Sequence, residues 1–259
     1  MSINISDLNN IFNNASDDGT ISKDTRDIVC NNLNDTVIMG CNGMALDDIE
    51  STEVTLITAL YDKSSSINSP GLKQAVIDGQ NEMIKAIEGS KNNDNIMIAQ
   101  WLFNEGTGVI HSYLPVEESV KLDKQNYIPQ GMTSLYDVLS EAMTANFAYT
   151  ELLKGSGTPV QNIILVITDG QDTSSVRIAG DVKKIYKDLL RTERYVLAYA
   201  GVGADDHKAI AESVGFPSVI VTGATASEIR KIFQMASESI VSLSQTKIDP
   251  NNKNSFFMV

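Results

Sequence analysis

The sequence predicts an α/β domain with a doubly wound, mostly parallel β-sheet, helices on both faces and one antiparallel edge strand. From about residue 53 onward, apolar runs rich in β-forming residues alternate with segments of helical periodicity. Two of these runs are separated only by the turn sequence NEGTG, residues 104–108. That loop is too short for a crossover connection, so it predicts an antiparallel pair.

The predicted strands are short apolar runs bounded by turn residues, as expected for strands that are buried on both faces. They span residues 54–61, 96–103, 162–168, 195–202 and 218–222, with a further strand directly after the turn at 104–108. Because all but one are expected to be parallel, their carboxyl ends should meet at one edge of the sheet, where such folds bind ligands.

The predicted helices have apolar side chains at spacings of three and four residues. Pro70 indicates the start of the first helix, which Gly89 ends, since proline is favoured at the first helical position. The other predicted helices cover residues 135–147, 178–189, 205–214 and 227–243.

The chain is expected to have three parts. Residues 1–50 are rich in Asn and Asp and only weakly periodic, which indicates an N-terminal appendage of short helices and loops. Residues 51–245 form the α/β domain, and residues 246–259 form a polar C-terminal tail with an apolar tip. A length of 259 residues suits one large domain with such an appendage.

The net charge of −13 makes nucleic acid and anionic membranes poor partners. Cations or basic protein surfaces fit it better, although acidity also serves solubility. No segment approaches the roughly 18 apolar residues that a membrane helix needs. The N-terminal sequence MSINISDLNN lacks the basic and apolar regions of a secretory signal. We therefore expect a cytoplasmic protein without a membrane span.

The few cysteines and histidines argue against several kinds of catalytic or metal site. Cys30 and Cys41 do not imply a disulfide framework. His111 and His207 lie far apart in the sequence, and neither belongs to a nucleophile or metal motif. This weakens a Ser-His-Asp, a Cys-His or a zinc interpretation.

Three short motifs bring carboxylates and hydroxyls to the same predicted end of the sheet. Asp62, Ser64 and Ser66 follow the first strand in DKSSS, Thr133 lies in GMTSLYD where a helix begins, and Asp169 follows a later strand in TDGQD. Oxygen ligands of this kind suit a hard divalent cation, and we expect Mg²⁺, with Mn²⁺ or Ca²⁺ as alternatives. Two acids and three neutral hydroxyls leave such a cation able to attract one more carboxylate.

Together, these three motifs resemble the metal-ion-dependent adhesion site (MIDAS) of a von Willebrand factor type A (vWA) domain: DxSxS, the threonine of GMTSLYD, and TDG. The resemblance to such a domain covers about residues 53–245. Met132 stands where a second glycine is frequent in that family. The resemblance implies a Rossmann-like binding module in which five residues hold the cation directly or through water: Asp62, Ser64, Ser66, Thr133 and Asp169.

The same resemblance implies that an Asp or Glu of a protein partner completes the coordination. In relatives, ligand binding can shift the last helix, here residues 227–243. Cytoplasmic microbial relatives often act beside an AAA+ ATPase or in a stress-response complex, so such a partner is expected here.

Other interpretations remain open at this point. Asp62, Thr133 and Ser134 are also good helix N-caps, Asp137 suits the first turn of a helix, and Asp172 has no clear role. A metal-dependent phosphatase or hydrolase of the haloacid dehalogenase kind also places an aspartate after its first strand. Such enzymes need a second aspartate two residues later, where this sequence has a serine. A vWA scaffold that acts without metal is the third interpretation. We expect a binding module rather than an enzyme.

Overall fold

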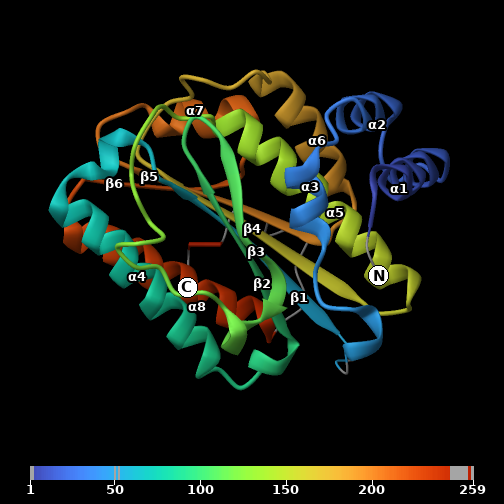
Figure 1. Ribbon diagram of the computed structural model, residues 1–259, viewed down its shortest axis with the longest axis horizontal. Helices are drawn as coiled ribbons and strands as arrows, with labels where there is room; N and C mark the ends of the chain where they lie inside the picture. The colour runs from blue at the N-terminus through green and yellow to red at the C-terminus, as the bar shows by residue number, and fades with distance from the viewer. Residues whose placement is uncertain (1–2, 50, 52, 246–255, 258–259) are drawn as a thin grey trace.

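The computed structural model describes residues 3–49, 51, 53–245 and 256–257. Its core is a six-stranded sheet with the order β3-β2-β1-β4-β5-β6 (Figure 1). All neighbouring strands are parallel except β2 and β3, which form the antiparallel edge. The predicted fold class is therefore confirmed. The strands are β1 (Val54–Asp62), β2 (Ile96–Phe103), β3 (Thr107–Pro115), β4 (Val160–Thr168), β5 (Tyr195–Val202) and β6 (Ser218–Thr222).

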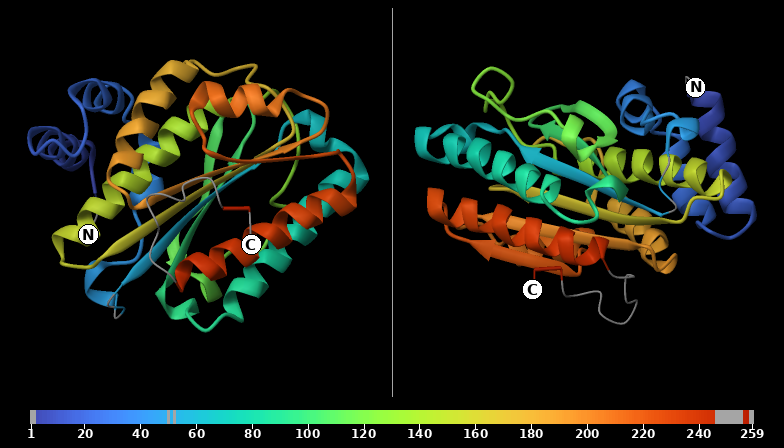
Figure 2. Two further views of the ribbon diagram at one scale, coloured as in Figure 1. Left: turned by 180° about the vertical axis from the view of Figure 1, so that it is seen from behind. Right: turned by 90° about the horizontal axis from the view of Figure 1, so that it is seen from below.

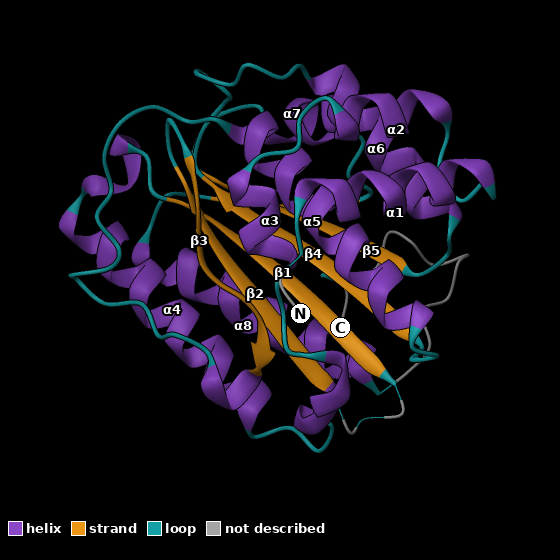
Figure 3. Ribbon diagram, turned by 45° about the vertical axis from the view of Figure 1, so that its right-hand side comes forward, coloured by secondary structure: helices purple, strands orange, loops and turns teal. Residues whose placement is uncertain are grey.

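Helices cover both faces of this sheet (Figures 1 and 2). On one face lie α4 (Pro70–Glu88) and α8 (Ala226–Ser244), whose apolar side chains share a core with that face. On the other lie α5 (Leu135–Gly155), α6 (Ala179–Arg191) and α7 (His207–Val214). The twist of the strands between the two helical layers is clearest in Figure 3.

Strand boundaries agree closely with the apolar runs, and the difference at β1 affects the site. The run 54–61 predicts a strand that ends before Asp62, but Asp62 is the last residue of β1. Its main chain still pairs with Phe103 of β2, so the ladder continues one residue past the apolar run. The carboxylate is consequently held by the sheet itself and not by a loop.

Residues 1–50 were expected to form short helices and loops, and the described part contains α1 (Ile5–Asp17), α2 (Lys23–Cys30) and α3 (Asp35–Cys41). Each helix begins at a side chain that accepts a hydrogen bond from the first turn: Asn4, Ser22 and Asn34. These helices pack on the outer side of α5 and α6 and share their apolar core. Whether residue 50 is a domain boundary stays a prediction.

Helix α5 is buried on almost every side, because the sheet lies beneath it and α1 and α3 lie over it. Phe12 of α1 stacks on Phe147 of α5 with ring centroids 5.7 Å apart. At Gly40 of α3, an added Cβ atom would lie 2.1 Å from the ring of the buried Trp101, so only glycine allows this close approach. The N-terminal helices are thus tightly fitted to the sheet domain.

Most of the predicted C-terminal tail, residues 246–255 and 258–259, lies outside the described residues. Phe256 is buried in the core on the α4 and α8 side, and its N–H donates to Ser218 Oγ at 3.3 Å. Phe256, at the start of the apolar tip, therefore packs on the domain. None of the helices in the described part of the chain combines the length and apolar character that crossing a bilayer requires.

The carboxylate of Asp188 on α6 anchors the start of α2 and gives a pH-dependent contribution to stability. Its Oδ2 accepts the N–H of Ser22 at 2.7 Å and the hydroxyl of Ser22 at 2.6 Å. Burial raises the pKa of Asp188, but hydrogen bonds from Ser22, Thr25 and Arg191 outweigh that effect and hold the pKa below its usual value. A lowered folded-state pKa means stability that is present above the unfolded value of 3.8 and lost as the pH falls through the folded value.

We therefore expect Asp188→Asn to lower the free energy of unfolding by about 1.5 to 3 kcal/mol at pH 7, the usual worth of hydrogen bonds to a charged group. The difference from the wild type should shrink below pH 4, where the wild-type carboxylate becomes protonated. Urea denaturation at pH 7, 4 and 3 measures this. A difference that stays constant over that range would show that the charge of Asp188 contributes nothing.

Candidate metal site

The predicted site lies where the strand order reverses. Strands β1 and β4 are neighbours, and the chain continues outward from them in opposite directions, to β2 and to β5. Asp62 ends β1 and Asp169 directly follows β4. The crevice at the carboxyl ends of two such strands is the usual ligand site of an open α/β sheet.

Hydrogen bonds fix the side chain of Asp62 at the bottom of this crevice. Its Oδ1 accepts the N–H of Ser64 at 2.7 Å, and its Oδ2 accepts the hydroxyl of Thr168 at 2.5 Å. The main-chain oxygen of Asp62 accepts the hydroxyl of Tyr127 at 2.5 Å. Because the residue is only 1% exposed, it has little freedom to turn away from the site.

A chain of polar oxygens joins the first motif to the third. The hydroxyls of Ser64 and Ser66 are 2.9 Å apart. Ser66 Oγ donates to Asp169 Oδ1 at 2.8 Å, and Ser64 Oγ lies 3.5 Å from the same oxygen. The structure thus brings together four of the five predicted ligands, although Asp169 is more than 100 residues from the two serines.

Thr133, the fifth predicted ligand, lies beside this group on the loop that precedes α5. It is 5% exposed, and its hydroxyl is 3.8 Å from the position that a Cβ atom on Gly170 would occupy. Gly170 directly follows Asp169, so the structure places Thr133 next to the third motif. Because glycine has no Cβ, no side chain of residue 170 lies between them.

The electrostatics of the site favour a cation. Burial raises the pKa of Asp62 to about 6; the hydrogen bond from Thr168 opposes this, and the charge of Asp169 adds to it. Burial also raises the pKa of Asp169. A buried carboxylate beside a half-buried one is costly in free energy, and a divalent cation between them removes much of that cost.

The donor set is also chemically selective. Within the described ranges, no group of three or more His, Cys, Asp or Glu side chains is arranged to hold a metal ion. The predicted ligands are two carboxylates and three hydroxyls. Such all-oxygen donors fit Mg²⁺ or Mn²⁺, whereas zinc sites rely mainly on nitrogen and sulfur.

The helix-capping interpretation of the motif residues is not supported. Helix α4 begins at Pro70 after Ser69, eight residues past Asp62, so Asp62 does not cap it. Ser134 occupies the N-cap position of α5 without a side-chain capping bond; its hydroxyl donates instead to the main-chain oxygen of Asn104 at 2.6 Å.

Several residues that support the site were missed by sequence reasoning. The Oγ1 of Thr173 accepts the N–H of Thr133 at 2.9 Å, and Asn104 Nδ2 donates to the main-chain oxygen of Gln130 at 2.9 Å. Thr168, which bonds Asp62, lies inside the TDG motif and could have been found there. No sequence pattern indicated a role for Tyr127, because its hydroxyl bonds to a main-chain oxygen 65 residues away in the sequence.

No protein-family model matches this sequence, and a search of curated proteins finds no relative. Solved structures do match. The PilB minor pilin from Streptococcus sanguinis aligns with a TM-score of 0.53 at 12% identity, over 75% of this chain and 63% of that chain. The pilus adhesin SpaC from Lactobacillus rhamnosus GG aligns with a TM-score of 0.55 at 11% identity, over 74% of this chain and 31% of that chain.

A third match is proximal thread matrix protein 1 from the mussel byssus, described as having a zinc-occupied MIDAS motif. Its TM-score is 0.48 at 19% identity, over 76% of this chain and 47% of that chain. The chain spans less than two thirds of each of these three structures. At such low identities the two closer alignments, with TM-scores above 0.5, indicate a shared fold and nothing about activity.

The fold is vWA-like. The parallel pairing and the antiparallel edge strand are those that the sequence predicts. Among the described residues, the carboxyl edge of β1 and β4 also carries the motif residues in the expected positions. Which residues bind a metal ion stays a prediction.

Proposed function

We propose that this protein is a metal-dependent protein-interaction module. In this proposal Asp62, Ser64, Ser66, Thr133 and Asp169 hold a divalent cation, most simply Mg²⁺, and an Asp or Glu of a protein partner completes the coordination. The observation that carries the proposal is the contact of Ser64 and Ser66 with Asp169 beside the buried Asp62.

The two carboxylates have different roles in this proposal. Asp62 accepts the N–H of Ser64 and so fixes the turn that presents both serine hydroxyls. Asp169 contacts the same hydroxyls from the loop that follows β4. A bound cation supplies the Lewis acidity that attracts an anionic oxygen from outside. Because two carboxylates only balance a charge of +2, such a site keeps affinity for a further carboxylate.

We propose binding without turnover. The position at which haloacid dehalogenase-like enzymes carry their second aspartate is Ser64, whose hydroxyl contacts Ser66. His207 is buried with its ring nitrogens bonded to Tyr199 and to the main-chain oxygen of Val202. A phosphatase assay with a general substrate tests the alternative. Phosphate release by the wild type that disappears in Asp62→Asn would favour an enzyme.

Two neighbouring serines give a matched test of the cation site. Mn²⁺ or Mg²⁺ at about 100 times its Kd should stabilise the wild type by about 2.7 kcal/mol, which raises the melting temperature by about 5 to 10 °C. Ser66→Ala should lose most of this increase. Ser65→Ala should keep it, because both serines are exposed but it is Ser66 whose hydroxyl contacts Asp169 and which is a predicted ligand. Equal increases in both variants would contradict the assignment of Ser66.

Capture of partners from the source cell tests the interaction itself. We expect a partner, for example the AAA+ ATPase or stress-response complex that the resemblance implies, to be retained with Mg²⁺ and released by a chelator. Thr133→Ala should fail to retain it. A partner that is retained in the presence of the chelator and also by Thr133→Ala would instead support a scaffold that acts without metal.

A further inference from the structure

The loop that follows Asp169 caps helix α5 from outside. The N–H of Tyr136 donates to Asp172 Oδ1 at 3.3 Å, and the N–H of Asp137 donates to Ser175 Oγ at 3.1 Å. The first N–H groups of any helix need partners from outside the helix. In α5 the loop over residues 170–178 supplies these two.

The same loop holds Thr133 through the main chain. The N–H groups of Thr173 and Ser174 donate to the carbonyl oxygen of Thr133 at 2.8 and 3.1 Å. Thr173 Oγ1 accepts the N–H of Thr133 at 2.9 Å. Since this loop also begins at Asp169, its conformation sets how far Thr133 lies from Asp169.

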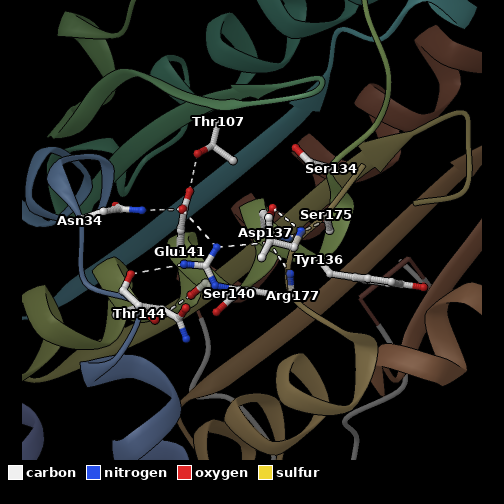
Figure 4. Close-up of polar contacts among 12 residues, drawn as sticks. Asn34, Thr107, Ser134, Tyr136, Asp137, Ser140, Glu141, Thr144, Ser175 and Arg177 are labelled. Atoms are coloured by element: carbon white, nitrogen blue, oxygen red, sulfur yellow. Dashed lines mark hydrogen bonds and ion pairs between the residues drawn. The ribbon is translucent and has the colours of Figure 1, made fainter. Parts of the chain in front are cut away.

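Arg177 fixes the far end of this loop (Figure 4). Its main-chain N–H donates to Asp137 Oδ1 at 2.9 Å. Its guanidinium Nη1 lies 3.3 Å from Asp137 Oδ1 and 3.2 Å from Glu141 Oε1, with a side chain only 11% exposed. Removing one member of such a buried ion cluster leaves uncompensated charge, so the loop would have to rearrange.

The N-terminal helices complete this cluster. Arg177 Nη2 donates to the main-chain oxygen of Asn32 at 3.3 Å. Asn34, the N-cap of α3, donates from Nδ2 to Glu141 Oε1 at 2.7 Å. Figure 4 shows the side chains of Asn34 and Arg177 both directed at the carboxylate of Glu141. Hydrogen bonds and ion pairs therefore connect residues 32–34, through Glu141 and Arg177, to the loop that follows Asp169.

We propose that Arg177 is a positioning residue for the cation site and that the helices α1–α3, through Asn32 and Asn34, set the site's affinity for divalent cations. This inference rests on the proposed function. It gives the segment around Asn32 and Asn34 a role in the site, beyond that of an appendage. If α1–α3 have only a structural role, loss of any of their contacts should lower the stability of the protein and leave its cation affinity unchanged. If the proposal is right, loss of the contacts of Asn32 or Asn34 with the Arg177 cluster should also weaken cation binding.

Three variants separate these possibilities. Arg177→Gln removes the charge at the centre of the cluster. Asn34→Ser keeps a good N-cap for α3 but removes the amide donor to Glu141. Ser22→Ala is the control, because it removes a contact between α2 and Asp188 that does not reach the loop.

The probe is Mn²⁺ alone, titrated into each full-length protein while free Mn²⁺ is measured by electron paramagnetic resonance. We expect the Kd to rise by about 10-fold in Arg177→Gln, as for other losses of residues that orient metal ligands, and by about threefold in Asn34→Ser. Ser22→Ala should lower the melting temperature of the metal-free protein yet leave the Kd unchanged. In the metal-free protein, amide exchange at Thr173 and Ser174 should accelerate in the first two variants only.

Each outcome of the Mn²⁺ titrations either supports the positioning role of Arg177 or contradicts it. If the wild type takes up no Mn²⁺, the proposed function itself fails. If the wild type binds Mn²⁺ and both Arg177→Gln and Asn34→Ser bind it equally well, the positioning role is overturned. An equal loss of affinity in Ser22→Ala overturns it too, because general loosening then explains the effect. Should Arg177→Gln fail to fold, Asn34→Ser decides alone.

Discussion

Asp169→Asn should abolish divalent cation binding while leaving the metal-free protein as stable as the wild type or more stable. The asparagine Oδ1 can still accept the hydroxyl of Ser66, which donates to Asp169 at 2.8 Å. The substitution also removes a negative charge whose presence raises the pKa of the buried Asp62. We expect the Mn²⁺ affinity to fall by at least about 100-fold, the upper end of what loss of an outer-shell contact costs.

Mn²⁺ titration and thermal unfolding of the metal-free protein measure the two halves of this prediction. Asp94→Asn is the matched control, since Asp94 is an exposed acid just before β2, at the opposite edge of the sheet. It removes the same charge and should leave Mn²⁺ binding unchanged. If Asp169→Asn binds Mn²⁺ like the wild type, the cation lies elsewhere.

Phe233→Ala should give the largest loss of stability, about 3 to 5 kcal/mol, as for other buried phenylalanines. Phe233 of α8 is 1% exposed, and its ring centroid lies 6.0 Å from that of Tyr61 in β1. At Gly79 of α4, an added Cβ atom would lie 2.3 Å from the Phe233 ring. The ring thus fills the space where α4, α8 and the sheet meet. Urea denaturation measures the loss.

A double variant shows whether α4 and α8 meet through this pair. Gly79→Ala alone should cost about 1 to 3 kcal/mol, because the helices would have to separate. Combined with Phe233→Ala, its methyl group occupies part of the new cavity, so the double variant should lose less than the sum of the two. Strict additivity would show that the helices do not contact each other at these residues. Mn²⁺ binding should survive in every variant that folds.

The sequence was sufficient to predict the fold class because its signals are local. Apolar runs and helical periodicity mark the elements, and the turn sequence NEGTG marks the antiparallel pair, although its last two residues, Thr107 and Gly108, already belong to β3. The convergence of Asp62, Ser64, Ser66 and Asp169 followed from a geometric rule, that the carboxyl ends of parallel strands meet at one edge.

Contacts between distant segments were not predictable in this way. The bond from Asn34 to Glu141 joins residues 107 apart, and that from Arg177 to Asn32 joins residues 145 apart. Neither pair belongs to a periodic pattern or a short motif, so the packing of α3 on α5 is needed to reveal them. For the same reason, residues 1–50 were predicted to be an appendage, but their described part shares a core and a polar cluster with the domain.

The central claim is that one divalent cation lies among the oxygens at the carboxyl ends of β1 and β4. Anomalous X-ray diffraction from crystals grown with Mn²⁺ tests it most directly. We predict one strong anomalous peak within coordination distance of Ser64 Oγ and Ser66 Oγ, next to Thr133 and Asp169. Anomalous density only at other positions, with none at these serines, would contradict it.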